Sequence, residues 1–105
     1  MKDAKSAYRR FSRGQQLYWD GRFEASRDEI KAAVEDDSTQ ALYMYVLALI
    51  EYRLGNEGEA RRYVTNAVRI ERVRSIDHWG RAMERYQGSA RVWLEKERAM
   101  ARGKN

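Results

Sequence analysis

Residues 52–60 read Tyr-Arg-Leu-Gly-Asn-Glu-Gly-Glu-Ala, and the aromatic residue, the first glycine and the final small residue of this stretch recur 34 positions earlier in the chain. In both places an aromatic residue is followed at equal offsets by a glycine and a small residue: Tyr18, Gly21 and Ser26 first, then Tyr52, Gly55 and Ala60. A fixed period of 20 to 50 residues is typical of stacked structural repeats. The sequence therefore predicts a repeat protein.

The same register extends on both sides of this stretch and reaches a third copy. The matched positions are Phe11 with Tyr45 and Trp79, Gly14 with Ala48 and Ala82, Tyr18 with Tyr52 and Tyr86, Ile30 with Val64, and Ala33 with Ala67. Within each half of the period these positions are mostly three, four or seven residues apart, which places them on one face of an α-helix. Each unit is thus predicted to consist of two helices joined by a short turn.

Glycine marks the predicted turn inside each unit. Gly21 and Gly55 follow the first helix of their units, and glycine adopts the left-handed conformation that ends a helix without steric cost. The absence of proline from all 105 residues also favours helices, because proline costs about 3 kcal/mol inside one. We expect an all-α protein with about six helices, near residues 4–19, 23–36, 39–54, 57–73, 76–87 and 90–102.

This pattern resembles the tetratricopeptide repeat family, whose unit is a 34-residue helical hairpin. The family's small, aromatic, glycine and alanine positions are matched by Gly14, Tyr18, Gly21, Ser26 and Ala33, and again by Ala48, Tyr52, Gly55, Ala60 and Ala67. The sequence departs from the family pattern at four positions: Leu17 and Glu51 stand where the family has its aromatic residue, and Ser38 and Arg72 replace its usual proline. The resemblance implies a right-handed superhelix of antiparallel helical hairpins, an α-solenoid, whose concave groove binds a peptide or partner protein.

The predicted organisation is a single domain over residues 1–105. The first repeat covers about residues 7–38 and the second about 41–72. The third unit, about residues 75–102, keeps Trp79, Ala82 and Tyr86 in register, but its glycine arrives one position early at Gly88. We interpret it as a degenerate repeat or a capping hairpin, since the terminal members of a stack have one face without a neighbour.

The face of the first helices supplies the candidate binding residues. They are Tyr8, Phe11, Gln15, Tyr18, Tyr45, Leu49, Tyr52, Arg53, Trp79, Met83 and Tyr86. Aromatic residues at helical spacing serve either as anchors for a peptide or as core that joins the helices. We expect a mixture in which Phe11, Tyr45 and Trp79 lie deeper, whereas Tyr18, Tyr52 and Tyr86 form an exposed row. Arg53 and Arg13 are the nearest cations for an acidic ligand.

Charge offers an alternative function. The net charge is +5, and residues 1–40 carry none of it, because their eight basic and eight acidic side chains cancel. The arginine-rich C-terminal half, with Arg61, Arg62, Arg69, Arg72 and Arg74, is therefore an alternative surface for nucleic acid or an acidic partner. We favour a protein or peptide partner because Glu59 and Glu71 interrupt this patch. Self-association through an open end of the stack is a third possibility, so we expect a monomer or a weakly self-associating chain.

Catalysis and metal binding find no support in the residues. The chain has no cysteine, and its one histidine, His78, lies beside Asp77 without further ligand spacing. No phosphate loop or dinucleotide fingerprint occurs. We expect no enzyme activity, no cofactor and no metal. The longest apolar stretch, residues 41–50, is about half of what a bilayer requires. The first residues show no signal peptide, which favours a soluble, cytoplasmic protein.

Overall fold

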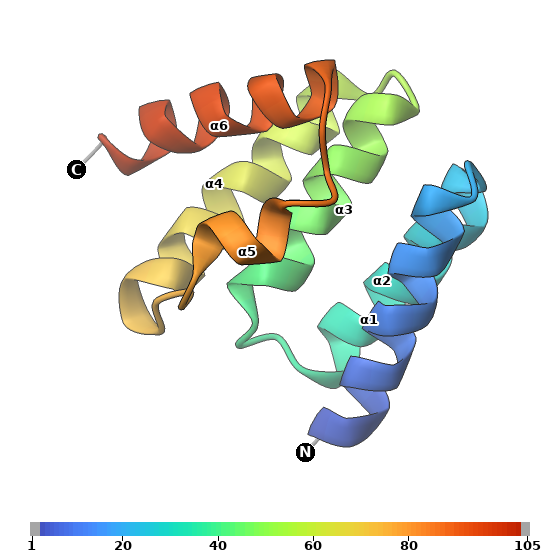
Figure 1. The fold of residues 1–105 in the computed structure, drawn as a ribbon. Coiled ribbons are helices and arrows are strands. Elements are labelled where there is room, and N and C mark those ends of the chain that lie inside the picture. The colour runs from blue at the N-terminus through green and yellow to red at the C-terminus, as the bar shows by residue number, and fades with distance from the viewer. Residues whose placement is uncertain (1–2, 104–105) are drawn as a thin grey trace.

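The computed structural model describes residues 3–103, and it begins with a helical hairpin (Figure 1). Helix α1 (Ala4–Trp19) starts after Asp3, whose side chain accepts a hydrogen bond of 2.9 Å from the Lys5 amide. The chain reverses at Gly21, at a φ of 81°, and returns as α2 (Phe23–Asp36). The predicted left-handed glycine turn is confirmed here.

The second hairpin repeats this construction. Helices α3 (Ala41–Arg53) and α4 (Glu57–Val73) are joined through Gly55, which has a φ of 85°. Helix α2 also packs on α3, so that the two hairpins lie side by side. Between them, Asp37 organises the connection, because its carboxylate accepts bonds from both the amide and the hydroxyl of Thr39, at 3.1 and 2.6 Å.

The third unit departs most from expectation. The helix predicted near residues 76–87 covers only α5 (Trp79–Met83), after His78, which takes the left-handed conformation with a φ of 56°. Helix α6 (Ser89–Arg102) then runs across α4 and α3 (Figure 1). Within residues 3–103, α6 therefore makes its main helix contacts with the second hairpin and not with α5.

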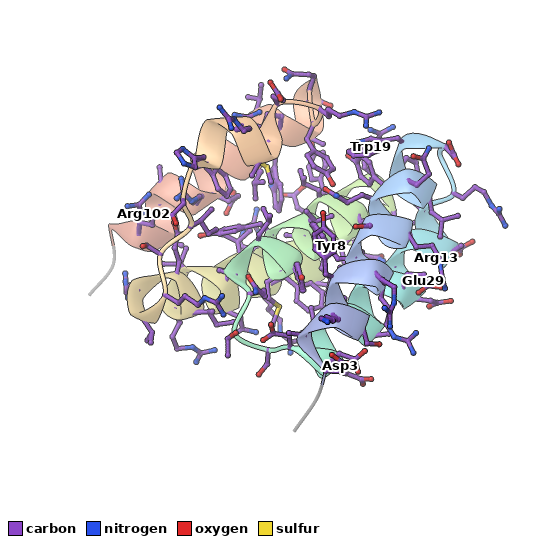
Figure 2. All side chains as sticks on the ribbon, turned by 60° about the horizontal axis from the view of Figure 1, so that its bottom comes forward. Asp3, Tyr8, Arg13, Trp19, Glu29 and Arg102 are labelled. Carbon is purple, nitrogen blue, oxygen red and sulfur yellow. The ribbon has the colours of Figure 1, made fainter. Side chains whose placement is uncertain are left out.

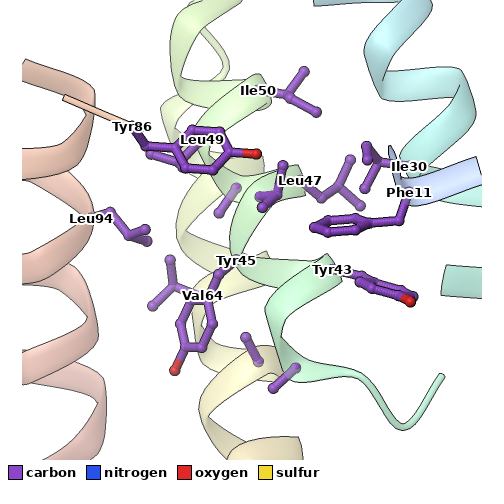
Figure 3. Packing of buried hydrophobic residues seen from close by; sticks show 14 of the residues in the cluster. Phe11, Ile30, Tyr43, Tyr45, Leu47, Leu49, Ile50, Val64, Tyr86 and Leu94 are labelled. Atoms are coloured by element: carbon purple, nitrogen blue, oxygen red, sulfur yellow. The ribbon is translucent and has the colours of Figure 1, made fainter. Parts of the chain in front are cut away.

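Helix α3 forms the centre of the molecule. It is the most apolar of the long helices, and nine of its residues are buried, namely Ala41, Tyr43 and the run from Tyr45 to Glu51. Side chains from the other helices cover it in one continuous cluster, which includes Phe11, Ile30, Val64, Tyr86 and Leu94 (Figure 3). The apolar segment that is too short for a membrane is therefore the core of a globular domain.

Within the first hairpin, two helices approach closely at Gly14. A methyl group at this position would lie 2.4 Å from Cδ1 of the fully buried Ile30, so only glycine fits without displacing a neighbour. The Ser26 hydroxyl donates a 2.6 Å hydrogen bond to the Gly14 carbonyl across the same contact. The other repeat-defining residues at helix contacts are also buried, namely Ala33, Ala48, Ala60 and Ala67, whereas Ala82 is partly buried.

The helices account for 78% of residues 3–103, and no strand occurs among them, which confirms the all-α class with six helices. In this part of the chain no helix is long and apolar enough to cross a membrane. The molecule measures 33 × 30 × 25 Å. Residues 1–2 and 104–105, which the predicted domain and the signal-peptide argument include, lie outside the described residues.

Candidate functional site

One stripe of α1 faces the C-terminal part of the chain. Tyr8, Gln15 and Trp19 share this stripe, because offsets of seven and four residues return to the same side of a helix. Tyr8 is 63% exposed, whereas Gln15 and Trp19 are partly buried. Figure 2 places Tyr8 and Trp19 at different heights along α1, so the stripe has an open end and a covered end.

Tyr86 covers the far end of this stripe. Its hydroxyl donates a 2.6 Å hydrogen bond to Oε1 of Gln15, and its ring lies edge-on to Tyr18, with centroids 5.2 Å apart. The same ring lies 5.7 Å from that of Trp19. Only 2% of Tyr86 is exposed, and this burial raises the pKa of its hydroxyl well above the usual value, so that the hydroxyl keeps its proton.

Two arginines hold the segment that carries Tyr86. The Arg85 guanidinium lies 3.6 Å from the centre of the Trp19 ring, a close cation–π contact. From α6, Arg91 donates hydrogen bonds of 2.8 and 3.3 Å to the backbone carbonyls of Met83 and Tyr86. Residues 83–86 are thus tied both to the first helix and to the last.

The contact between Tyr18 and Tyr86 joins residues that are two repeat periods apart. In a regular stack each repeat touches only its neighbours, so that the second unit would separate these two side chains. Tyr52, the equivalent residue of the second unit, instead stacks on Trp93 of α6 with centroids 4.7 Å apart. Arg85 and Tyr86 of the third unit therefore reach back to the first, whereas α6 packs on the second.

A second polar cluster fixes α5 and α6 to the core. The Tyr45 hydroxyl donates a 2.5 Å hydrogen bond to Glu71, and Arg98 pairs with the same carboxylate while its guanidinium lies 3.8 Å from the centre of the Trp79 ring. Burial alone would raise the pKa of Glu71, but the hydrogen bonds from Arg98 and Tyr45 outweigh it and hold that pKa below its usual value. The Glu71 carboxylate is thus paired and hydrogen-bonded, and this cluster, which we call the Glu71 joint, connects α3, α4, α5 and α6.

The predicted exposed row is wrong for two of its three members. Tyr18 and Tyr86 are 6% and 2% exposed, because they pack on each other, and only Tyr52 is partly open. Of the residues expected to lie deeper, Phe11 and Tyr45 are buried and Trp79 is partly buried. Leu49 and Met83 are buried as well. Most of the aromatic pattern is therefore core.

The arginines proposed for an acidic ligand already have partners. Arg53 is exposed, but its guanidinium lies 4.6 Å from the Phe23 ring centre and 5.8 Å from that of Tyr18. Arg13 pairs with Glu29 at 3.2 Å. The contacts of Arg53 extend the aromatic packing at the end of α1, and the ion pair of Arg13 links α1 to α2.

The arginine-rich stretch of α4 is engaged in a similar way. Arg61 pairs with Glu57 and Glu97 at 2.7 and 3.0 Å, and Arg62 pairs with Glu59 at 2.5 Å. The remaining members also have hydrogen-bond partners: Arg69 bonds Asn66, Arg72 bonds the carbonyls of Ala101 and Arg102, and Arg74 bonds Thr39. Side chains of the protein itself thus neutralise part of the predicted basic track.

A surface pocket of about 240 Å³ opens where the connection between α2 and α3 meets the segment before α5. Leu42, Arg74 and Ile76 are among its lining residues. The volume suits one or two side chains better than a drug-sized ligand.

The sequence patterns missed three residues of this site, namely Trp19, Arg85 and Arg91. Trp19 shares a helix stripe with Tyr8 and Gln15, so helical periodicity carried that signal. Nothing in the spacing indicates the contacts of Arg85 and Arg91, because they depend on an irregular segment. Among residues 3–103 no group of three His, Cys, Asp or Glu side chains is arranged to hold a metal ion. No protein-family model, curated protein or solved structure matches this chain.

Proposed function

We propose that this chain is a non-enzymatic protein-interaction module that binds a peptide or partner helix along the inner face of α1 and α3. The inner face is the surface between these helices that begins at Tyr8 and runs toward Trp19. One end of it already holds a short non-helical segment through an aromatic ring, a hydroxyl and a guanidinium. Such anchors are typical of peptide recognition by proteins.

The proposal includes the arrangement of the helices. The hairpins α1–α2 and α3–α4 would stack as in tetratricopeptide repeats, in a right-handed superhelix whose first helices line the concave side. Two features support this arrangement: α3 packs against both helices of the first hairpin, and the close contacts of Gly14 fall on a position that this family keeps small. The third unit would act as the cap of so short a solenoid.

The exposure of Tyr8 carries the proposal. An aromatic side chain that is 63% exposed lies on the same stripe as Gln15 and Trp19, two turns from the place where they hold Tyr86. A tyrosine in this position offers a rigid ring and a hydroxyl at little conformational cost. The pocket between the α2–α3 connection and the segment before α5, with Arg74 at its wall, would provide a recess for one side chain of the bound peptide.

Panning a displayed library of random twelve-residue peptides against the full chain tests this function. We expect enriched peptides to bind with micromolar dissociation constants and to lose at least tenfold in affinity to the Tyr8→Ala variant. The matched control is Val92→Ala, which also truncates an exposed apolar residue, 70% exposed, but on α6. Absence of enriched peptides, or equal loss in both variants, contradicts the proposal.

The electrostatic alternative has its own test. If the arginines of α4 bind nucleic acid, the affinity for a labelled oligonucleotide should fall by orders of magnitude from about 50 to 200 mM salt. The ion pairs of Arg61 and Arg62 argue against this function, because their carboxylate partners compete with phosphate. Self-association as an architectural element predicts instead that the sedimentation coefficient rises with protein concentration.

A further inference from the structure

The segment from Met83 to Gly88 contacts the protein as a bound peptide would. It begins at Met83, the last residue of α5, and residues 84–88 form no regular helix; only two of its side chains, Met83 and Tyr86, are buried. Glu84, Arg85, Gln87 and Gly88 remain exposed. Two buried anchors three residues apart, separated by exposed residues, are the pattern by which short peptides are recognised.

The inner face recognises this segment by its chemistry. Gln15 reads the hydroxyl of Tyr86, the ring lies against Tyr18 and Trp19, and the Arg85 guanidinium lies over the Trp19 indole. Each element of the pair Arg85–Tyr86 thus has its own complement on α1. A tyrosine directly preceded by an arginine satisfies this site, and a peptide without them leaves it unfilled.

The fit of the resident segment is incomplete. The Nε1 atom of Trp19 is buried and has no hydrogen-bond partner among the described residues, although an indole N–H seeks an acceptor. An external peptide whose backbone carbonyl reaches this atom gains a bond that residues 83–88 do not make. Such a peptide can therefore compete with residues 83–88, because it makes one hydrogen bond that they lack.

The connections of the segment allow it to be exchanged. Helix α5 has only five residues, and the residue before it, His78, adopts a left-handed conformation that is unfavourable for a side chain other than glycine. On the other side, α6 holds the backbone of the segment through the Arg91 side chain, which bonds the carbonyls of Met83 and Tyr86, and through the Val92 amide, which donates a 3.1 Å hydrogen bond to the Gly88 carbonyl. Exchange therefore requires the release of the Arg85 and Arg91 contacts and of the buried side chains of Met83 and Tyr86 from the core cluster.

We propose that residues 83–88 are a resident ligand of the inner face, and that the site takes in exchange an external peptide containing an Arg-Tyr pair. This inference rests on the proposed function and extends it in two ways. It names an Arg-Tyr pair as the recognised feature of the peptide, and it makes residues 83–88 an intramolecular competitor for the site. Wild-type protein would bind such peptides weakly, because the site is open in only a small fraction of molecules.

Complementation with a peptide tests the inference. The acceptor is the full chain with Tyr86→Ala, and the probe is a nine-residue peptide with the sequence of Ala82–Ala90. In ¹⁵N–¹H spectra the three tryptophans give three indole N–H signals, and a Trp19→Phe variant assigns one of them. We expect the peptide to shift the Trp19 signal of the Tyr86→Ala chain, with a dissociation constant below about 1 mM, and at least tenfold more weakly in wild type.

A second variant covers the possibility that Tyr86→Ala does not fold. Arg91→Ala leaves Gln15, Tyr18 and Trp19 unchanged but removes the side-chain tie between the segment and α6, so it should also bind the peptide more tightly than wild type. The control peptide carries alanine in place of Tyr86, and we expect no shift with it. If neither folded variant responds to the tyrosine peptide, or both peptides act alike, the inference is overturned.

The outcomes separate this inference from the proposed function. If library peptides bind in a Tyr8-dependent way and their affinity is unchanged by Tyr86→Ala, the proposed function is supported and the resident-ligand inference is refuted. Binding of the nine-residue peptide to Tyr86→Ala, without any library peptide for the wild type, would support the resident ligand and count against a wild-type peptide-binding function.

Discussion

The hydroxyl of Tyr86 lies 2.6 Å from Oε1 of Gln15, and this bond joins residues that are 71 positions apart. It connects the first helix to the irregular segment before the last one. We therefore expect Tyr86→Phe to lower the free energy of unfolding by about 1 kcal/mol, because a partly buried amide oxygen loses its donor. Urea denaturation measures the change. In the Gln15→Ala background the same substitution should cost clearly less; equal costs in both backgrounds would mean that the bond contributes nothing.

Gly14 should not tolerate alanine. The new methyl group would meet Cδ1 and Cγ1 of Ile30 at 2.4 and 2.7 Å, and overpacking of this kind costs about 1–3 kcal/mol. The better helix propensity of alanine returns up to about 1 kcal/mol. A net loss of about 1 kcal/mol in urea denaturation is expected. Ile30→Val removes the nearest methyl group, so Gly14→Ala should be less costly in that background, and an undiminished cost would contradict the proposed clash.

Glu51 is a buried carboxylate, and we expect its ion pair with Arg27 to contribute to the free energy of unfolding. It is 3% exposed, and its partners are Arg27 at 3.4 Å and the Asn56 side chain at 2.9 Å. Arg27→Met should cost about 2 kcal/mol in urea denaturation, because a buried charge keeps only one donor. Glu51→Gln in the same chain should recover part of this loss. Arg62→Met, which breaks an exposed pair, is the control and should cost below about 0.5 kcal/mol.

The Glu71 joint predicts a loss of stability in acid. Its pKa is lower in the folded protein than in the unfolded chain, so its contribution is complete above the unfolded value, near 4.5, and disappears as the pH falls through the folded value. We expect the melting temperature to drop on acidification below about pH 4.5, and Glu71→Gln to reduce that slope. Thermal melts followed by circular dichroism from pH 7 to 2.5 measure both. Parallel curves for the two chains would argue against a role of Glu71.

Helical periodicity was sufficient to predict the two hairpins. The ends of α1, α2 and α4 agree with expectation, and α3 begins two residues later than expected. Gly21 and Gly55 were predictable because a left-handed turn requires a particular residue. The contact of Tyr18 with Tyr86 was not, since repeat spacing describes neighbouring units and this pair skips one. The spacing also did not indicate that α5 ends at Met83. Helical periodicity shows which residues share a face of a helix, but it does not show where a long-range contact such as that of Tyr86 interrupts the helix.

The placement of α3 at the centre has a consequence for how the protein is made. Its apolar residues 41–50 leave the ribosome well before Met83, Tyr86 and Leu94, which belong to the cluster that encloses them. Until those residues emerge, part of α3 is an apolar surface exposed to water, which can bind chaperones or neighbouring nascent chains. A message that ends prematurely after α4 would thus yield an aggregating product and not a smaller working protein, so the segment from Met83 to Leu94 protects the rest during synthesis.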